Sequence, residues 1–279
     1  MFSIYMIING KKIADEILND LSAAVKKLTR KPQVAAVLVG DQGNGRKFLE
    51  VKKKAAEKVG IEFRIYEFPE DISSKELRKN LVQIVKGSTI SGMIIELPLP
   101  EKFNTQYILN SIPEDKDPDV LSLKAQGSFF GSRSKVLPPA VEAVKEVLEE
   151  NKIDLKGKRC VIFGYGLLVG RPVSHWLASE GATVEVINEF TKSPGEISKE
   201  ADIIISGVGK PNLITADMVK EGAIVIDFGY EELGGKVVGD VDFEQVSKKA
   251  SLITPVPGGV GPIVVAAVLK NLLTLFRGK

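Results

Sequence analysis

The chain has 279 residues, which predicts about two domains of ordinary size. Hydrophobic residues make up 44% of it and charged residues 27%, so the composition excludes a disordered, collagen-like or coiled-coil chain. The 38 basic and 36 acidic side chains leave a net charge of +2, and we therefore expect no nucleic-acid partner. One cysteine, Cys160, excludes an internal disulfide and a multi-cysteine metal site, and one histidine, His175, excludes a histidine-rich metal site.

Neither end of the chain predicts export or membrane insertion. The start is apolar for only eight residues and lacks a basic region and a small-residue cleavage site. The late apolar stretch at 262–269 is far shorter than the roughly 20 residues that a bilayer requires. The sequence therefore predicts no membrane partner and a cytoplasmic location.

Helical and strand patterns alternate in the first half of the chain, which predicts a parallel α/β sheet. Ser73 and Glu76 form a capping-box pattern, and Asn104 is placed to cap a short helix. The predicted elements are a strand or extended lead-in at 1–8, a helix over 13–28, a strand at 33–40, a helix at 44–59, a strand at 61–68, a helix over 73–86 and a strand at 93–100.

Residues 113–138 are rich in Pro, Asp, Ser and Gly and show little periodicity, which predicts a domain boundary. Pro138 and Pro139 then begin a helix that runs to about residue 150. The second half alternates again, with strands at 159–164, 183–188, 202–209, 223–229 and 251–257, a helix at 172–180, helices between the later strands, and a last helix at 262–276.

A glycine-rich loop connects a predicted strand to a predicted helix at Gly164, Gly166 and Gly170. Glycines there allow the backbone to turn tightly and to approach a pyrophosphate at the helix N-terminus. The Gly-x-Gly-x-x-x-Gly spacing is one residue longer than the usual dinucleotide fingerprint, so the loop alone also fits a plain glycine turn. The strand–loop–helix–strand context favours dinucleotide binding.

Glu189 ends the next predicted strand, 25 residues after Gly164. An acidic side chain at this place typically accepts hydrogen bonds from the adenosine ribose, which favours NAD over NADP. Tyr165, Arg171 and Lys192 are nearby side chains that could tolerate a 2′-phosphate. A solvated glutamate at a strand end is an equally good interpretation.

Two irregular segments remain. Prolines and glycines at 253–262 fix the backbone after a strand, which favours a ligand-lining loop over a purely structural turn. The run DKDPD at 115–119 has the spacing of a calcium loop, but Val120 and Gln126 stand where an EF-hand requires Gly and Glu. We therefore predict no calcium site, and a polar turn is the simplest alternative.

Phe48 and Lys52 share one face of a predicted helix, which by itself is a weak signal. Together with eight further motifs they resemble the methylenetetrahydrofolate dehydrogenase/cyclohydrolase family over nearly the whole chain. These motifs, in the family's order, are VGD (39–41), ELPLP (96–100), DKDPD (115–119), VGRP (169–172), VGKP (208–211), GAIVIDFG (222–229), VVGDVDF (237–243) and TPVPGGVGP (254–262).

The resemblance implies two α/β domains, an N-terminal catalytic domain and a Rossmann-like dinucleotide-binding domain, with the C-terminal helix returning to the first. We expect the first domain at 1–119 plus 262–279 and the second at 120–261. The implied activity oxidises 5,10-methylenetetrahydrofolate to 5,10-methenyltetrahydrofolate by hydride transfer to NADP, with NAD possible, and then hydrolyses it to 10-formyltetrahydrofolate. One-carbon metabolism, purine biosynthesis and a homodimer are further expectations.

The resemblance also implies roles for individual residues. Lys52, Glu96 and Asp119 are the implied catalytic residues; Lys52 matches the family lysine of the cyclohydrolase step, and Asp119 matches the aspartate that holds the pterin. The implied substrate-binding residues are Phe48, Lys52, Leu97, Pro98, Asp119, Pro257, Gly258 and Gly259. The implied cofactor-binding residues are Gly164, Tyr165, Gly166, Val169, Gly170, Arg171, Glu189, Lys192, Gly207, Val208, Gly209 and Gly229, and no metal site is implied.

Three departures from the family's pattern bear on this activity. Phe48 replaces the tyrosine that stacks on the folate; it keeps the ring face but lacks the hydroxyl. Glu96 replaces a glutamine and is expected beside Lys52, where its charge favours the ammonium form, a poor base. The carboxylate then becomes the candidate base, and the ammonium stabilises developing negative charge. Glu189 falls where NADP-using relatives often carry a phosphate-binding side chain.

Two other functions stay open at this point. A monofunctional methylenetetrahydrofolate dehydrogenase, with NAD as a candidate cofactor and without cyclohydrolase activity, is motivated by Phe48 and Glu96. A non-catalytic folate or dinucleotide sensor is disfavoured because Lys52 and Asp119 are retained.

Overall fold

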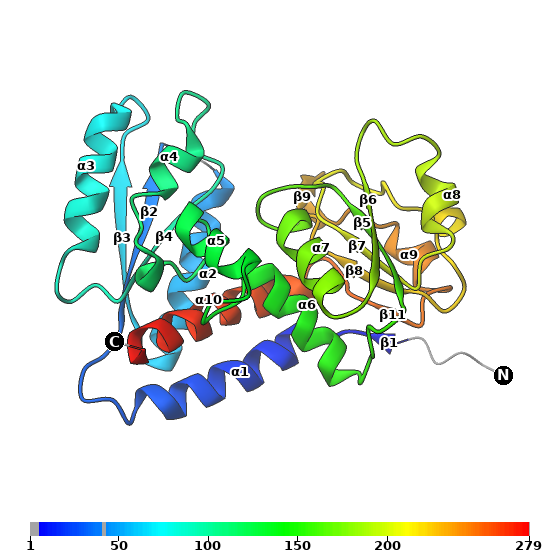
Figure 1. The fold of residues 1–279 in the computed structure, drawn as a ribbon, viewed down its shortest axis with the longest axis horizontal. Helices are drawn as coiled ribbons and strands as arrows, with labels where there is room; N and C mark the ends of the chain where they lie inside the picture. The colour runs from blue at the N-terminus through cyan, green and yellow to red at the C-terminus, as the bar shows by residue number, and fades with distance from the viewer. Residues whose placement is uncertain (1–5, 41–42, 279) are drawn as a thin grey trace. The chain divides into compact units, whose positions relative to one another are not determined.

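The computed structural model describes residues 6–40 and 43–278, and its elements are labelled in Figure 1. The chain divides into two compact units. The three-stranded unit consists of Asp15–Pro139 and Val265–Lys279, and the six-stranded unit consists of the chain up to Ala14 and Ala140–Val264. Each boundary near an end of the chain falls inside a helix, the first in α1 (Gly10–Val25) and the last in α10 (Val260–Arg277).

The three-stranded unit is built around the parallel sheet β3-β2-β4. The middle strand β2 (Gln33–Val39) is apolar almost throughout, and its residues from Val34 to Val39 are all buried, as expected of a parallel strand that is covered on both faces. The other elements are α2 (Asn44–Val59), β3 (Glu62–Phe68), α3 (Ser74–Val85), β4 (Gly92–Ile95), α4 (Thr105–Leu109), the 3₁₀ turn η1 (Glu114–Lys116) and α5 (Leu123–Phe130).

The six-stranded unit contains the parallel sheet β1-β11-β8-β7-β5-β6. Val161, Ile204 and Val225 from three neighbouring strands belong to one buried apolar cluster that forms its core. The elements are β1 (Met6–Ile7), α6 (Pro139–Glu150), β5 (Arg159–Phe163), α7 (Gly170–Ser179), β6 (Thr183–Ile187), α8 (Pro194–Ser198), β7 (Ile203–Ser206), the 3₁₀ turn η2 (Ala216–Met218), β8 (Ile224–Asp227), a β9 (Glu231–Leu233) and β10 (Lys236–Val238) hairpin, α9 (Phe243–Val246) and β11 (Leu252–Ile253).

The predicted α/β fold class is confirmed, and so are the predicted helix caps. The Ser73 hydroxyl accepts a hydrogen bond from the Glu76 amide at 3.2 Å, and the Asn104 side chain accepts one from the Tyr107 amide at 3.0 Å. The strand predicted at 93–100 ends at Ile95, before the proline-rich segment begins. Residues 1–5 of the predicted lead-in at 1–8 lie outside the described residues, and Met6 and Ile7 form a short strand.

Some predicted elements were wrong. No helix was predicted at 113–138, but this segment contains η1 and the helix α5, which begins after the cap Ser122. Alpha-helical periodicity is hard to detect in a helix of eight residues. Between β7 and β8 the chain forms only the turn η2 where a helix was expected, and the β9–β10 hairpin was not predicted.

The units also have different bounds from those predicted for the domains. Met6 pairs with Leu252 in β11, which places β1 in the six-stranded unit. Asn271 of α10 donates from Nδ2 to the carbonyls of Pro118 at 2.9 Å and Leu137 at 2.7 Å. These two bonds connect the C-terminal helix and the segment after residue 120 to the three-stranded unit.

α10 has the length and hydropathy of a membrane-spanning helix, but 56% of it is buried inside the protein. Core helices of proteins without membrane spans have the same properties. Its buried Asn271 is committed to two backbone carbonyls of the same unit. We therefore interpret α10 as a core helix of the protein.

We predict that Asn271→Leu lowers the free energy of unfolding by about 2–4 kcal/mol, because a buried and a partly buried carbonyl lose their donor. Urea denaturation followed by circular dichroism measures this change. Thr274→Ala, an exposed position on the same helix, is the matched control and is expected to change stability by less than about 0.5 kcal/mol. Equal stability of the Asn271 variant and the control would contradict the assigned role.

Candidate functional site

Lys52 and Glu96 form an ion pair in the three-stranded unit. The Lys52 Nζ lies 2.7 Å from the Glu96 Oε2, and the two side chains are only 18% and 7% exposed. Lys52 comes from the middle of α2, and Glu96 directly follows the buried strand β4. The Glu96 amide donates to the Val37 carbonyl at 2.9 Å, which holds it beside β2 at the carboxyl edge of the sheet. The two charges are therefore held together with little access to water.

Asp119 supplies a third ionisable group to this site. Burial raises the pKa of Asp119 to about 7; the positive charge of Lys52 opposes this shift, and the charges of Asp117 and Glu96 add to it. Its side chain is half-buried, and none of the hydrogen bonds among the described residues ends on its carboxylate. Asp119 is thus available to accept hydrogen bonds from a ligand and titrates near neutral pH.

Asp117, two residues earlier, has a structural role. Its Oδ2 accepts hydrogen bonds from the amides of Leu121 at 3.0 Å and Ser122 at 2.7 Å. Burial raises the pKa of Asp117, and its Oδ1 has no hydrogen-bond partner among the described residues. The carboxylate fixes the loop that carries Asp119. Among the described residues no group of three His, Cys, Asp or Glu side chains is placed to hold a metal ion.

The remaining predicted substrate contacts divide between the two units. Phe48 is half-buried and lies one helical turn before Lys52 in α2. Leu97 and Pro98 directly follow Glu96 and are joined by a cis peptide bond. Pro257, Gly258 and Gly259 belong to the six-stranded unit, where the Gly10 amide donates to the Gly258 carbonyl at 3.0 Å. Their contact with substrate stays a prediction.

The glycine-rich loop of the six-stranded unit leads from β5 to the N-terminus of α7. Gly164 has a φ of +89°, which favours glycine, and a Cβ on Gly170 would lie 2.1 Å from the Gly164 carbonyl oxygen. A Cβ on Gly166 would meet no atom within 4 Å, so there is open space above the loop at this point. The tight turn and the open backbone in front of a helix N-terminus fit a dinucleotide pyrophosphate.

The strand order places this loop at a topological switch point. From β5 the chain continues to β6 on one side of it and then to β7 on the other. A Cβ on Gly164 would lie 3.2 Å from the Val208 side chain, so the loops after β5 and β7 touch. Tyr165, Leu168 and Val208 are 54%, 49% and 44% exposed on these loops. In open α/β sheets ligands bind at such a point, and exposed apolar side chains suit the rings of a dinucleotide.

Two buried carboxylates that the sequence analysis missed brace the loops at this edge. Asp240 accepts hydrogen bonds from the Ser206 hydroxyl at 2.6 Å, the Val208 amide at 2.7 Å and the Lys210 amide at 2.8 Å. Asp227 accepts from the amides of Gly229, Asp240 and Val241 at 2.7, 3.2 and 3.0 Å. Burial raises the pKa of Asp227 to about 6, opposed by the Gly229 hydrogen bond. The only sign of these two carboxylates in the sequence was that each lies inside a family motif, Asp227 in IDFG and Asp240 in VVGD.

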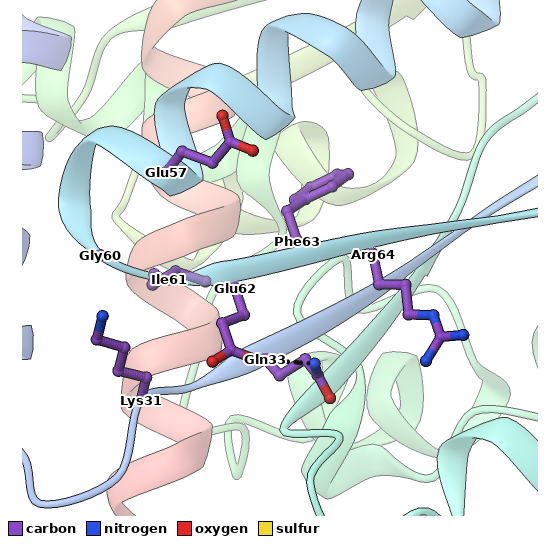
Figure 2. Close-up of a pocket in the computed structure, with 8 residues that line it drawn as sticks. All are labelled: Lys31, Gln33, Glu57, Gly60, Ile61, Glu62, Phe63 and Arg64. Atoms are coloured by element: carbon purple, nitrogen blue, oxygen red, sulfur yellow. Dashed lines mark hydrogen bonds between the residues drawn. The ribbon is translucent and has the colours of Figure 1, made fainter.

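The hollow drawn in Figure 2 is a different feature. It has a volume of about 390 Å³ and lies between the last turns of α2 and the start of β3. Glu57 and Phe63 face it, and the side-chain amide of Gln33 donates from Nε2 to the Glu62 carboxylate at 2.9 Å. None of the predicted site residues lines it: the hollow lies at the amino ends of β2 and β3, whereas Glu96 follows the carboxyl end of β4.

Comparisons with known proteins agree with this arrangement. Residues 8–119 match the sequence model of the tetrahydrofolate dehydrogenase/cyclohydrolase catalytic domain, and residues 138–279 match that of its NAD(P)-binding domain. A bifunctional protein FolD of Nautilia profundicola is 44% identical over 269 residues, 95% of each chain.

Two solved structures extend this likeness to the fold. The bifunctional FolD of Campylobacter jejuni is 37% identical with a TM-score of 0.94, covering 98% of this chain and 99% of that one. The FolD of Trypanosoma brucei, solved with NADP and an inhibitor, is 31% identical with a TM-score of 0.93, covering 98% and 97%.

We predict that Gly170→Ala disrupts the glycine-rich loop, because its Cβ would overlap the Gly164 carbonyl. The free energy of unfolding is expected to fall by roughly 2–4 kcal/mol. Gly166→Ala, where a Cβ meets open space, is the control and is expected to keep its thermal midpoint. Thermal unfolding of both variants measures the difference, and equal midpoints would show that the loop is not closely packed.

Proposed function

The chain belongs to the tetrahydrofolate dehydrogenase/cyclohydrolase family, and on that premise we propose that it oxidises 5,10-methylenetetrahydrofolate and hydrolyses the product to 10-formyltetrahydrofolate. The observation that carries the proposal is the buried Lys52–Glu96 ion pair, whose charges also act on Asp119. Purine biosynthesis and a homodimer stay predictions from the resemblance, and a cytoplasmic location stays a prediction from the sequence.

In the oxidation step the protein has to bind and orient its substrates. A bound nicotinamide dinucleotide supplies the hydride acceptor, and the glycine-rich loop and the exposed apolar side chains at the switch point fit such a molecule. No side chain has to accept the hydride, so positioning is the main requirement. The NADP of the Trypanosoma brucei relative supports this cofactor class. The choice between NADP and NAD depends on the loop after β6.

The folate contacts follow from the side chains of the three-stranded unit. The Asp119 carboxylate is suited to accept hydrogen bonds from the ring N–H and the exocyclic amine of a pterin. The Phe48 ring offers an apolar face for stacking, which does not require the hydroxyl of a tyrosine. Together they orient the one-carbon bridge of the substrate relative to Lys52 and Glu96.

The hydrolysis step requires proton transfers that the ion pair can provide. As water adds to the methenyl carbon, the Glu96 carboxylate accepts one of its protons. The Lys52 ammonium donates a proton to N5 when the bond between N5 and the carbon breaks, which leaves Lys52 as a neutral amine. The hydroxyl proton of the adduct then passes to the Lys52 amine as the formyl carbonyl forms. The proton on Glu96 is released to solvent, which matches the single proton released overall.

The bifunctional activity is favoured over a monofunctional dehydrogenase. The relatives from Nautilia profundicola and Campylobacter jejuni both carry bifunctional names over nearly the full length of this chain. Of the two departures that motivated the alternative, Glu96 forms an ion pair with Lys52, and Phe48 keeps an aromatic face in α2.

Glutamine is the family's residue at this position, but in this chain the proposed proton acceptor is the Glu96 carboxylate and not Lys52. We therefore predict that Glu96→Gln lowers the rate of methenyltetrahydrofolate hydrolysis by about 100-fold at pH 7. Methylenetetrahydrofolate oxidation is expected to change by less than about threefold, since it needs no base. Absorbance assays of the two steps, corrected for spontaneous hydrolysis, measure both rates.

Lys54→Met, at an exposed lysine two residues after Lys52 and on another face of α2, is the control for the hydrolysis assay. It is expected to keep the wild-type rate. Unchanged hydrolysis in the Glu96 variant would contradict the role of the carboxylate, and equal loss of both activities would indicate damage to the whole site.

We predict that substrate binding depends on the ionisation of Asp119. Above pH 7 the carboxylate is ionised and accepts both pterin hydrogen bonds; below pH 7 it carries a proton and loses one of them. The kcat/KM for methylenetetrahydrofolate is therefore expected to rise between pH 6 and pH 8, with a midpoint near 7. Asp119→Asn is expected to raise KM and to remove this rise, so a rise that persists in the variant would contradict the assignment.

A further inference from the structure

The loop after β6 carries the side chain that is expected at the adenosine ribose of a bound dinucleotide. β6 pairs with β5 in parallel, and the Gly164 amide donates to the Ile187 carbonyl at 2.8 Å. The end of β6 therefore lies directly beside the start of the glycine-rich loop. In dinucleotide-binding units the end of this second strand is where the ribose hydroxyls are recognised. Glu189 is the second residue after β6.

A tight turn holds Glu189 at its tip. The Asn188 side chain accepts a hydrogen bond from the Phe190 amide at 3.0 Å, and the Thr191 hydroxyl accepts one from the Asn188 amide at 3.0 Å. The Thr191 amide closes the turn on the Asn188 carbonyl at 3.0 Å. Glu189 is exposed, and no hydrogen bond or ion pair among the described residues engages its carboxylate. It is free to accept hydrogen bonds from two ribose hydroxyls.

The nearest arginine in the sequence, Arg171, has its Nε–H committed to the glycine-rich loop. Arg171 donates from Nε to the Tyr165 carbonyl at 3.1 Å, and its guanidinium carbon lies 5.5 Å from the centre of the Tyr165 ring. Lys192, three residues after Glu189, is exposed and is the remaining cation in this segment. A 2′-phosphate carries nearly two negative charges at neutral pH, and Glu189 would repel it.

Phe190 adds an apolar surface beside this carboxylate. It is 83% exposed, the largest exposure among the described large apolar side chains. An exposed aromatic ring next to a ribose-binding group offers a stacking surface for the adenine ring. The pair Glu189–Phe190 thus supplies an acceptor for the ribose and a face for the base, and neither contributes positive charge.

From this arrangement we infer that the site is built for an unphosphorylated adenosine ribose, so that the cofactor is NAD and Glu189 selects it. The inference rests on the proposed function for the use of a nicotinamide dinucleotide. It departs from the expectation of NADP that came from the resemblance. Glu189 is a specificity-determining residue, and the hydride-transfer step itself does not require it.

Calorimetric titration with two fragments that lack nicotinamide tests the inference without any turnover. The fragments are ADP-ribose and 2′-phospho-ADP-ribose. We expect the wild-type protein to bind ADP-ribose at least about tenfold more tightly than 2′-phospho-ADP-ribose. This factor corresponds to the hydrogen bonds that the ribose hydroxyls donate to the charged Glu189 carboxylate. Glu189→Ser is expected to weaken ADP-ribose binding and to bring the ratio of the two dissociation constants to about one or below.

Two control variants separate selection from general damage. Glu180→Ser removes the same charge at the C-cap of α7, at the far end of that helix from the glycine-rich loop, and is expected to keep the wild-type ratio. Phe190→Ala is expected to weaken both fragments by the same factor, because stacking does not involve the 2′ position.

Each other outcome overturns the inference in a distinguishable way. Equal or tighter binding of 2′-phospho-ADP-ribose by the wild-type protein would overturn the selection of NAD and leave the proposed function intact. A wild-type preference that persists in Glu189→Ser would overturn the role of Glu189. Binding of neither fragment would overturn the inference together with the use of a dinucleotide in the proposed function.

Discussion

The arrangement of both candidate sites depends on one constraint, the parallel pairing of buried strands. Strands such as β2 and β7 are covered on both faces and carry almost no polar side chains, so polar groups must lie where the strands end. Because parallel strands all end at the same edge, the residues that follow them gather there. Glu96 follows β4, and the glycine-rich loop follows β5, for this reason.

Buried carboxylates then fix the loops that leave this edge. Asp117 holds the loop that carries Asp119, and Asp227 and Asp240 hold the loops after β8 and β7. The raised pKa values of Asp117 and Asp227 show what burial does to these groups, since removal from water disfavours the charged form. Backbone amides offset that loss by donating to the carboxylates. Rigid loops of this kind keep the contacts to a ligand in place before it binds.

The sequence predicts much of this structure and misses identifiable parts. Strand β2 is a continuous apolar run and helix α2 is long, so the sequence predicts the bounds of both to within one residue. Helix α5 has only eight residues and lies in a segment dominated by turn-forming residues, which hides its pattern. The bracing by Asp227 and Asp240 joins residues distant in sequence, and no local spacing reveals it. The Lys52–Glu96 contact was expected only through the family resemblance, because a lysine in a lysine-rich helix carries no signal by itself.

The central claim is that Lys52 and Glu96 act as one unit in hydrolysis, and a double-mutant cycle tests it most directly. The rates of methenyltetrahydrofolate hydrolysis are measured for Lys52→Met, Glu96→Gln and the double variant. If the pair acts as a unit, the double variant loses about as much activity as either single variant, on the order of 100-fold. A loss equal to the product of the two single effects, on the order of 10,000-fold, would contradict the account.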